Sequence, residues 1–176
     1  MILRIDRVAS PLGILTLVAD DTVLRALTFD DHGGWLDRHL AQHYPECTVE
    51  QASDPLGVAS RLAAYFAGAL EAIDDIPVEP RGSDFQRAVW AALHEIPVRT
   101  TTTYGALAKR LGKPPGASRA VGLANGSNPV AIVVPCHRVI GANDKLVGYG
   151  GGLPRKQWLL AHERVELPLM PPALAS

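Results

Sequence analysis

The chain has 176 residues, a hydrophobic content of 47%, a charged content of 20% and a formal net charge of −1. These values are ordinary for a soluble globular protein, and the length allows one or two small domains. No apolar run approaches the roughly 18 residues that cross a bilayer, which excludes a membrane-spanning helix. Residues 1–7 alternate charged and apolar side chains, unlike a signal peptide, so we expect a cytoplasmic protein.

The near-neutral net charge hides an uneven distribution along the chain. Residues 1–80 contain 5 Lys and Arg against 13 Asp and Glu, a balance of −8, whereas residues 81–164 contain 12 against 4, a balance of +8. A basic half of this kind favours a polyanionic partner such as DNA. Ordinary solvated surface charge is the alternative interpretation, and the acidic half would keep the protein soluble.

The first 80 residues read as a small sheet with helices. Apolar and β-branched residues predict strands near residues 2–8, 13–18 and 23–29, and the Asp20–Asp21 pair between the last two predicts a hairpin. Helical spacing of apolar residues predicts helices at 35–43 and 55–70. The acidic, proline-containing stretch 74–80 is typical of a linker. Residues 1–80 therefore form one predicted domain, including this linker.

The second half reads as mostly helical. Ser83 with Gln86 three residues later forms a capping-box pattern, which starts a helix that ends near residues 96–97. Helices at 103–111 and 117–125, joined by a short Gly/Pro turn, predict a helix-turn-helix, and a last helix spans about 154–164. We expect an α+β protein with a second domain at 81–166 and a flexible tail at 167–176.

The most reactive feature of the sequence is Cys136, within Val-Pro-Cys-His-Arg-Val-Ile at 134–140. A thiol reacts as its thiolate, which needs a base or positive charge beside it, and His137 and Arg138 follow directly. Residues 131–134 read as a short buried strand, which would place Cys136 where a strand meets a loop. A buried structural cysteine is the alternative for an isolated Cys-His pair.

Several blocks in this half are similar, in order and spacing, to the O6-alkylguanine-DNA alkyltransferase family. They are Pro-Cys-His-Arg-Val at 135–139, Asn-Pro at 128–129, Gly-Tyr at 148–149, Tyr-Gly-x-Leu-Ala at 104–108, Arg-Ala-Val-Gly at 119–122 and Leu-Leu-Ala-His-Glu at 159–163. They cover roughly residues 81–164. The first 80 residues resemble the family only loosely, where its N-terminal domain is ribonuclease H-like.

The resemblance implies a reaction and the residues that carry it out. The alkyl group passes from O6 of guanine to Cys136, irreversibly and once per molecule, with O4-alkylthymine as a minor substrate. His137 acts on the thiol through a water, Glu163 holds His137, and Asn128 orders the active-site loop. The resulting chain of groups follows the logic of a catalytic triad.

The resemblance also implies how DNA is held. Because the base cannot react inside the duplex, it is flipped out, and Arg119 fills the space it leaves. Tyr104 contacts the phosphate near the flipped nucleotide and hydrogen-bonds the base. Thr103, at a helix N-terminus, is a candidate phosphate ligand. Ser118 and Ala120 belong to the same helix as Arg119, where small residues let the helix approach the duplex.

Backbone groups of Cys136, Val139, Tyr149 and Gly150 would form the base pocket. Gly150 replaces a serine of some members, and we expect the lost bulk to admit larger O6-alkyl groups. Arg99 stands where the family usually has glycine; it adds a phosphate contact or changes the turn, and both interpretations remain open.

We expect no metal and no cofactor. His39, His43 and Cys47 recur at four-residue spacing, but Pro45 interrupts the helix and no fourth ligand is near. The expected partner is double-stranded DNA carrying O6-alkylguanine, with no membrane, a monomer in the free state and room for cooperative binding on DNA. Two other functions compete: a lesion sensor, which in this family lacks the cysteine, and an unrelated cysteine hydrolase or redox enzyme.

Overall fold

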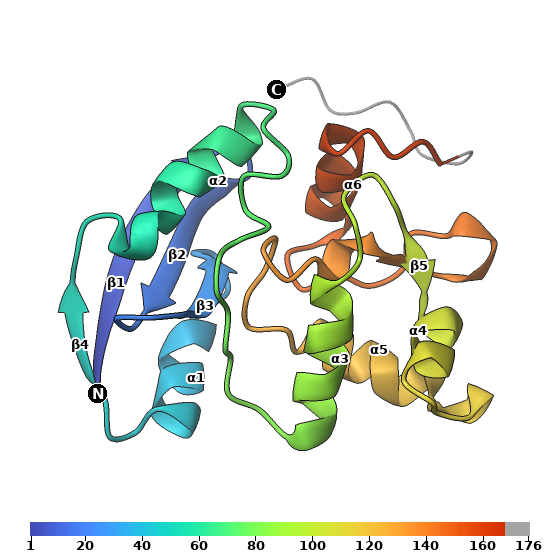
Figure 1. Cartoon of the computed structure of the whole chain (residues 1–176), viewed down its shortest axis with the longest axis horizontal. Coiled ribbons are helices and arrows are strands. Elements are labelled where there is room, and N and C mark those ends of the chain that lie inside the picture. The colour runs from blue at the N-terminus through green and yellow to red at the C-terminus, as the bar shows by residue number, and fades with distance from the viewer. Residues whose placement is uncertain (168–176) are drawn as a thin grey trace. The chain divides into compact units, whose positions relative to one another are not determined.

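The computed structural model describes residues 1–167, which form two compact units. The first contains Met1–Gly82 with Pro129–Val133, and the second contains Ser83–Asn128 with the described residues from Val134 onward. A sheet in the first unit and helices in the second confirm the predicted α+β class (Figure 1). No helix of the described residues is long and apolar enough to cross a membrane.

The first unit is built on a four-stranded sheet. Its strands are β1 (Ile2–Ser10), β2 (Gly13–Ala19), β3 (Leu24–Phe29) and β4 (Thr48–Gln51), in the order β3-β2-β1-β4. β1–β2 and β2–β3 pair antiparallel, which confirms the predicted hairpin; β4, which was not predicted, pairs parallel with β1. Asp20 closes the hairpin because its carboxylate accepts hydrogen bonds from the N–H groups of Thr22 and Val23, at 2.8 and 2.9 Å.

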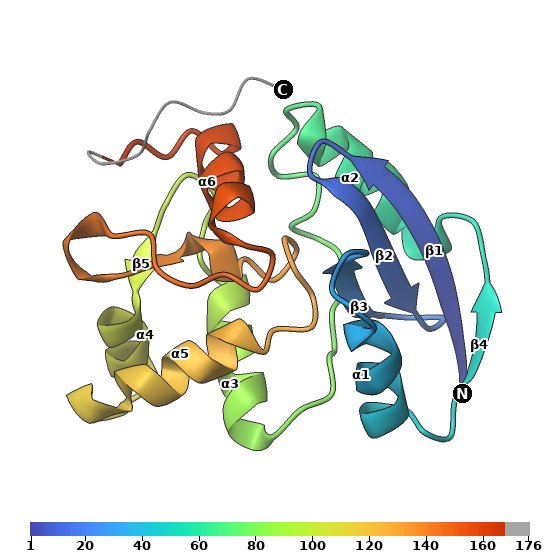
Figure 2. The same ribbon diagram turned by 180° about the vertical axis from the view of Figure 1, so that it is seen from behind.

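Two helices complete this unit. α1 (Trp35–His43) lies where it was predicted, and α2 (Val58–Phe66) is shorter than the predicted 55–70. Pro55–Gly57 form a separate 3-10 turn because Leu56 has a φ of 58°, and Gly68, with a φ of 113°, stops the helix. α2 lies over one face of the sheet, in front of it in Figure 1 and behind it in the reverse view of Figure 2.

The second unit is mostly helical. It contains α3 (Asp84–His94), α4 (Tyr104–Arg110), α5 (Ser118–Gly126) and α6 (Leu153–His162), and two short strands, β5 (Thr102–Thr103) and β6 (Val139–Ile140), pair in parallel. The capping box is confirmed: the Ser83 hydroxyl accepts from the Gln86 N–H at 3.1 Å, and the Gln86 side chain accepts from the Ser83 N–H at 2.9 Å.

The predicted strand at residues 131–134 is wrong. These residues form turns, and Ile132 has a φ of 70°, which no strand allows. Only residues 129–131 pair with a strand. Leu27 of β3 donates to the carbonyl of Pro129 and accepts from the N–H of Ala131, at 2.9 and 2.8 Å. The run is apolar because it is buried, and a buried turn and a buried strand have the same composition.

Arg99 adopts the left-handed backbone conformation that favours glycine, with a φ of 67°. Its side chain is exposed. Arg99 thus holds, at some cost in strain, a backbone conformation that glycine adopts freely. Most of the tail predicted at 167–176 lies outside the described residues.

Candidate active site

Cys136 opens a 3-10 turn, Cys136–Arg138, instead of ending a strand. Its N–H donates to the carbonyl of Val134 at 2.8 Å, and its own carbonyl accepts from the N–H of Val139. The side chain of Asn128 donates to the same Val134 carbonyl at 2.8 Å. The cysteine is only 6% exposed, so a tight, buried turn fixes the position of its sulfur.

Burial decides the protonation of the thiol. It raises the pKa of Cys136 above its ordinary value, and a hydrogen bond from Asn128 and the charge of Lys156 oppose this rise without cancelling it. The resting group is therefore a thiol at neutral pH. Nucleophilic chemistry at this sulfur requires a neighbouring base.

His137, Arg138 and Glu163 form a buried network beside the cysteine. Glu163 Oε1 lies 2.8 Å from His137 Nε2, and both Glu163 and His137 are fully buried. Arg138 binds the same carboxylate through two nitrogens, Nε at 2.9 Å and Nη2 at 2.8 Å, and its third, Nη1, donates to the Ile96 carbonyl at 2.6 Å. Arg138 thus pairs with both a carboxylate and a backbone carbonyl.

The charges in this network follow from its contacts. Burial alone would raise the pKa of Glu163, but the charges and hydrogen bonds of its two partners lower it far below the ordinary range, so the group is a carboxylate. Burial lowers the pKa of His137, which leaves a neutral ring at pH 7. Neutral His137 then donates from Nε2 to Glu163, and its Nδ1, which has no hydrogen-bond partner in the described structure, is left as a proton acceptor.

Sequence reasoning missed Lys156, a fully buried lysine on α6. Its Nζ donates to the carbonyls of Val139, Val147 and Gly148 at 2.6, 2.9 and 3.0 Å. Lysine is rarely buried, which is why composition assigns it to the surface. The helical spacing did contain the signal, since Lys156 lies three and four residues before the buried pair Leu159–Leu160 and seven before Glu163.

The segment around Gly148–Tyr149 joins the site through α4 as well. The Tyr104 hydroxyl donates to the Val147 carbonyl at 3.2 Å. Burial raises the pKa of Tyr104, and the Cys136 thiol adds to that rise, which is consistent with a sulfur close to this ring. Tyr149 is also raised well above its ordinary pKa by burial and then by Cys136, whereas Gly150 is exposed.

The predicted helix-turn-helix is present as α4, the 3-10 turn Pro115–Ala117 and α5. Thr103 caps α4 because its hydroxyl accepts from the Ala106 N–H at 3.1 Å. The Trp90 indole of α3 donates to the Ala124 carbonyl at 2.9 Å and so holds α5 in place.

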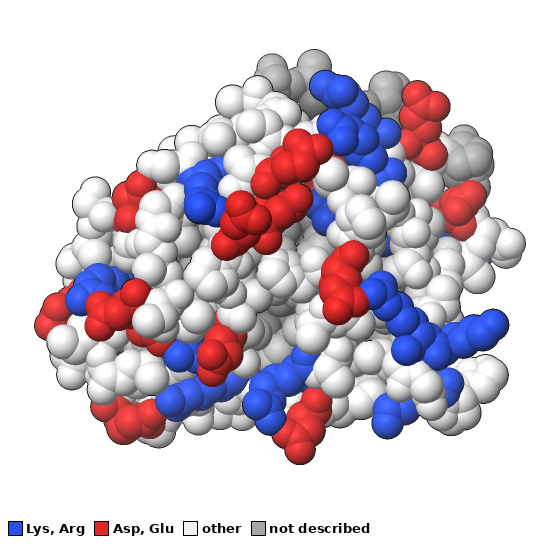
Figure 3. All heavy atoms as spheres, viewed as in Figure 1, with Lys and Arg blue, Asp and Glu red and all other residues white. Residues whose placement is uncertain are grey.

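The outer face of α5 carries the residues expected to meet DNA. Arg119 and Ala120 are exposed, and Leu123 is 72% exposed, while Ser118 is half-buried and donates to the Pro115 carbonyl at 3.0 Å. On the face drawn in Figure 3, mostly Lys and Arg side chains gather over the region of α4. The structure thus connects Cys136, His137, Glu163, Asn128 and Val139 through direct contacts, and presents Arg119 and Ala120 on a separate, exposed helix face of the same unit.

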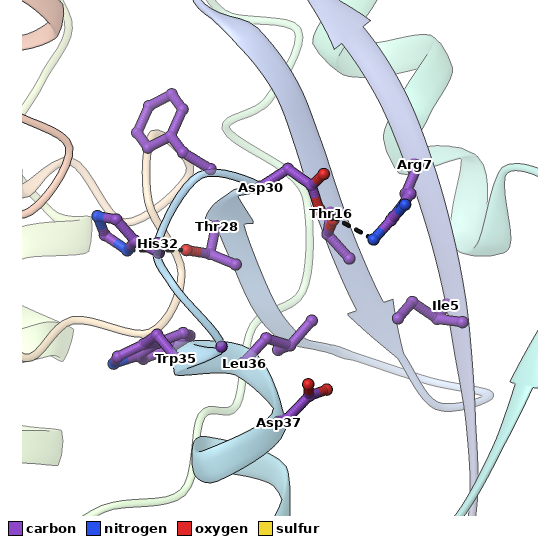
Figure 4. Close-up of a pocket in the computed structure, with 11 residues that line it drawn as sticks. Ile5, Arg7, Thr16, Thr28, Asp30, His32, Trp35, Leu36 and Asp37 are labelled. Carbon is purple, nitrogen blue, oxygen red and sulfur yellow. Dashed lines mark hydrogen bonds and ion pairs between the residues drawn. The ribbon is translucent and has the colours of Figure 1, made fainter.

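The first unit contains a cavity of about 160 Å³ between β1–β3 and the start of α1 (Figure 4). Its polar side chains bind one another: Arg7 and Thr16 both contact Asp30 at 3.1 Å, and Thr28 lies 3.3 Å from His32. Nothing in this arrangement selects a ligand, and none of the lining residues belongs to the unit that holds Cys136.

The His39, His43 and Cys47 series does not form a metal-binding group. His39 stacks on Trp35 with ring centroids 4.7 Å apart, and burial lowers its pKa to about 4. Within residues 1–167, no group of three or more His, Cys, Asp or Glu side chains could hold a metal ion.

Two family descriptions match most of the chain. Residues 84–165 match the 6-O-methylguanine DNA methyltransferase, DNA binding domain, and residues 4–80 match the 6-O-methylguanine DNA methyltransferase, ribonuclease-like domain.

Individual relatives agree with these matches. The chain is 51% identical over 164 residues to a methylated-DNA–protein-cysteine methyltransferase of Mycolicibacterium paratuberculosis, covering 92% of each protein. It is 48% identical over 161 residues to the protein of the same name from Salmonella typhimurium, covering 90% of this chain and 94% of the relative. The crystal structure of Mycobacterium tuberculosis OGT in complex with DNA superimposes with a TM-score of 0.76 at 42% identity, covering 96% of each chain.

Proposed function

Because the chain belongs to the 6-O-methylguanine DNA methyltransferase family, we propose that it repairs alkylated DNA by moving the alkyl group from O6 of guanine to the sulfur of its own Cys136. The observation that carries this proposal is the buried cysteine beside a neutral histidine whose Nε2 is held 2.8 Å from a carboxylate. A thiol nucleophile needs a base and a group that orients the base, and here these two groups, His137 and Glu163, contact each other.

The transfer is a displacement at the alkyl carbon. The Cys136 thiol gives its proton, through a water, to Nδ1 of His137, and the thiolate attacks the carbon bound to O6. The new S–C bond forms as the O–C bond breaks, and the guanine anion that leaves takes up a proton to become guanine. A thioether is a very poor leaving group, so each molecule reacts once.

The remaining residues of the site orient these groups. Glu163 fixes the ring and tautomer of His137, and Arg138 keeps Glu163 ionised. Asn128 stabilises the thiolate and holds the Val134 carbonyl in the turn before the cysteine. The carbonyls of Cys136 and Val139, with the backbone of Tyr149 and Gly150, bind the flipped guanine. No metal or cofactor takes part in this scheme.

DNA binds along the helix-turn-helix. Arg119 is exposed on α5 and can enter the base stack, where its planar guanidinium replaces the extruded nucleotide. Ser118 and Ala120 lie beside it, and Thr103 and Tyr104 at the start of α4 contact the phosphates near the flipped base. The substrate is double-stranded DNA with O6-alkylguanine, and O4-alkylthymine is a minor substrate. The protein acts in the cytoplasm as a monomer, and binding along DNA can be cooperative.

The test is the intact mass of the protein after incubation with duplex DNA that contains one O6-methylguanine. We expect a single added methyl group, mapped to Cys136, in the native protein and none in Cys136→Ala. The second free cysteine supplies the matched control, so Cys47→Ala should be methylated like the native protein. Binding of the lesion without any mass change would instead indicate a lesion sensor, and methylation that persists in Cys136→Ala would refute the assignment of the acceptor.

A further inference from the structure

Lys156 connects two segments that border the cysteine. Its three N–H groups are all used: one binds the Val139 carbonyl in β6, and two bind the carbonyls of Val147 and Gly148. An ammonium group has three donors, so this geometry satisfies it completely. The lysine therefore fastens the segment before Tyr149 to the strand that follows the Cys136 turn.

The positive charge of Lys156 has no acidic partner. Within residues 1–167 it makes no ion pair, and Glu163, seven residues further along the chain, pairs with His137 and Arg138. Burial lowers the pKa of Lys156 to about 8, and the charge of Cys136 acts in the opposite direction. At neutral pH the amine is thus mostly protonated, and the ionised form of the Cys136 thiol would supply a counter-charge for it.

The other groups that act on the thiol are neutral or are paired elsewhere. Tyr104 of α4 and Tyr149 both have raised pKa values and stay protonated, and His137 is neutral. The Asn128 amide is uncharged and donates a hydrogen bond. Among the described residues, Lys156 is thus a cation whose charge lowers the pKa of the Cys136 thiol.

The Val139 carbonyl gives the same lysine a second effect. A carbonyl has two lone pairs, and Lys156 uses one of them at 2.6 Å. This contact fixes the direction of the carbonyl and leaves the other lone pair for the exocyclic amine of a bound guanine.

We propose that Lys156 is a positioning residue for alkyl transfer: its ammonium holds residues 147–148 against β6 to form the wall of the base pocket, and its charge favours the Cys136 thiolate. The role in the pocket rests on the proposed function. The effect on the thiol does not, and it can be measured without DNA.

The test compares Lys156→Met, which has similar length but no charge, with Lys156→Arg, which keeps the charge. Lys145→Met is the matched control, because it removes an equal charge from an exposed side chain just before residues 147–148, which Lys156 binds. Each protein is treated with iodoacetamide between pH 6 and 10, and peptide masses separate the reaction of Cys136 from that of Cys47. Circular dichroism establishes that each variant is folded.

We expect the pH profile of Cys136 in Lys156→Met to move upward by one unit or more, which lowers its rate at pH 7.5 about tenfold or more. In Lys156→Arg, which keeps the positive charge, Cys136 should react within about threefold of the native rate. In Lys145→Met it should react at the native rate. Amides of residues 147–150 should exchange hydrogen faster in Lys156→Met than in Lys145→Met. A folded Lys156→Met with the native profile would overturn the proposal.

The Arg variant keeps the test decisive if Lys156→Met does not fold. If Lys156→Arg folds but its Cys136 reacts about tenfold more slowly at pH 7.5, as expected for a one-unit rise in the pKa of the thiol, then packing and not charge is responsible. That result overturns the proposal. Failure of the proposed function has a different result, since the native protein would then gain no methyl from lesion DNA while iodoacetamide still distinguishes the lysine variants.

Discussion

Replacing Glu163 with glutamine tests the buried network most directly. The carboxylate accepts hydrogen bonds from His137 and from two nitrogens of Arg138, and it is the only acidic group in contact with that guanidinium among the described residues. Glutamine keeps one acceptor oxygen but carries no charge. The variant therefore leaves Arg138 as a buried cation without a counter-charge, at 4% exposure.

The size of the effect follows from burial. Removing one partner of a buried ion pair costs about 3–5 kcal/mol, and we expect the lower end, about 3 kcal/mol, because one acceptor oxygen remains. For a chain of this length, each kcal/mol lowers Tm by about 2–4 °C, so Tm should fall by about 6–12 °C. Alkyl transfer should slow by about 10² or more, since His137 loses the group that orients it.

Thermal unfolding followed by circular dichroism measures the change in stability, with Glu95→Gln as the control. Glu95 also pairs with an arginine, Arg110, but both side chains are about half exposed or more, so its loss should cost less than 1 kcal/mol. A Tm for Glu163→Gln as high as that of Glu95→Gln would refute the argument that burial makes this carboxylate important.

The buried contact of Glu163 with Arg138 and His137 also predicts that stability depends on pH. The folded-state pKa of Glu163 lies below its ordinary value of 4.5, so its contribution to stability is complete above about pH 4.5 and is lost as pH falls below it. The difference in Tm between native protein and Glu163→Gln should therefore be constant from pH 7 to 5 and shrink at lower pH. A difference that grows on acidification would contradict the assigned ionisation.

Three further substitutions test separate parts of the second unit. Arg99→Gly should raise Tm by about 2–4 °C, because relief of a left-handed residue is worth about 1 kcal/mol. Arg87→Gly inside α3 should lower Tm by a similar amount. A change in Tm of the same sign in both variants would contradict this explanation. Ser83→Ala should cost about 1 kcal/mol in urea unfolding through loss of the helix cap, and no change would show that the capping box contributes nothing. Arg119→Ala should slow methyl transfer from duplex DNA by at least about tenfold and leave iodoacetamide labelling of Cys136 unchanged; a parallel loss of both would mean that Arg119 supports the fold instead of base extrusion.

Local sequence signals were sufficient for elements with a periodic apolar pattern, or with a turn or cap signal at one end. The β2–β3 hairpin, α1, α3 and the helix-turn-helix all have such periodicity or a turn or cap at their ends, and the structure confirms them. The strand β4 has neither, because all four of its residues are exposed and only backbone pairing with β1 defines it. The run at 131–134 failed because it is apolar and mostly buried, like β3, and its composition alone does not distinguish a buried turn from a buried strand.

The candidate site shows a similar division. The contact of His137 with Glu163 was anticipated from the motif blocks and is present in the structure, while the link from His137 through a water to Cys136 and the catalytic roles remain predictions. Lys156 could not be found from residue type, because a buried lysine depends on three carbonyls brought together by the fold. The three carbonyls make the buried position of the lysine stable, and they belong to residues 8 to 17 positions away in the chain.

The pairing of β5 with β6 links the DNA-binding helices to the nucleophile mechanically. Thr103 is both the cap of α4 and the partner of Ile140, and Thr102 pairs with Val139, three residues after Cys136. This short ladder therefore joins the start of α4 to the turn that holds Cys136. We expect a change in the tilt of α4 to disturb this turn, so an exchange of the helix-turn-helix between relatives would have to preserve the β5–β6 register.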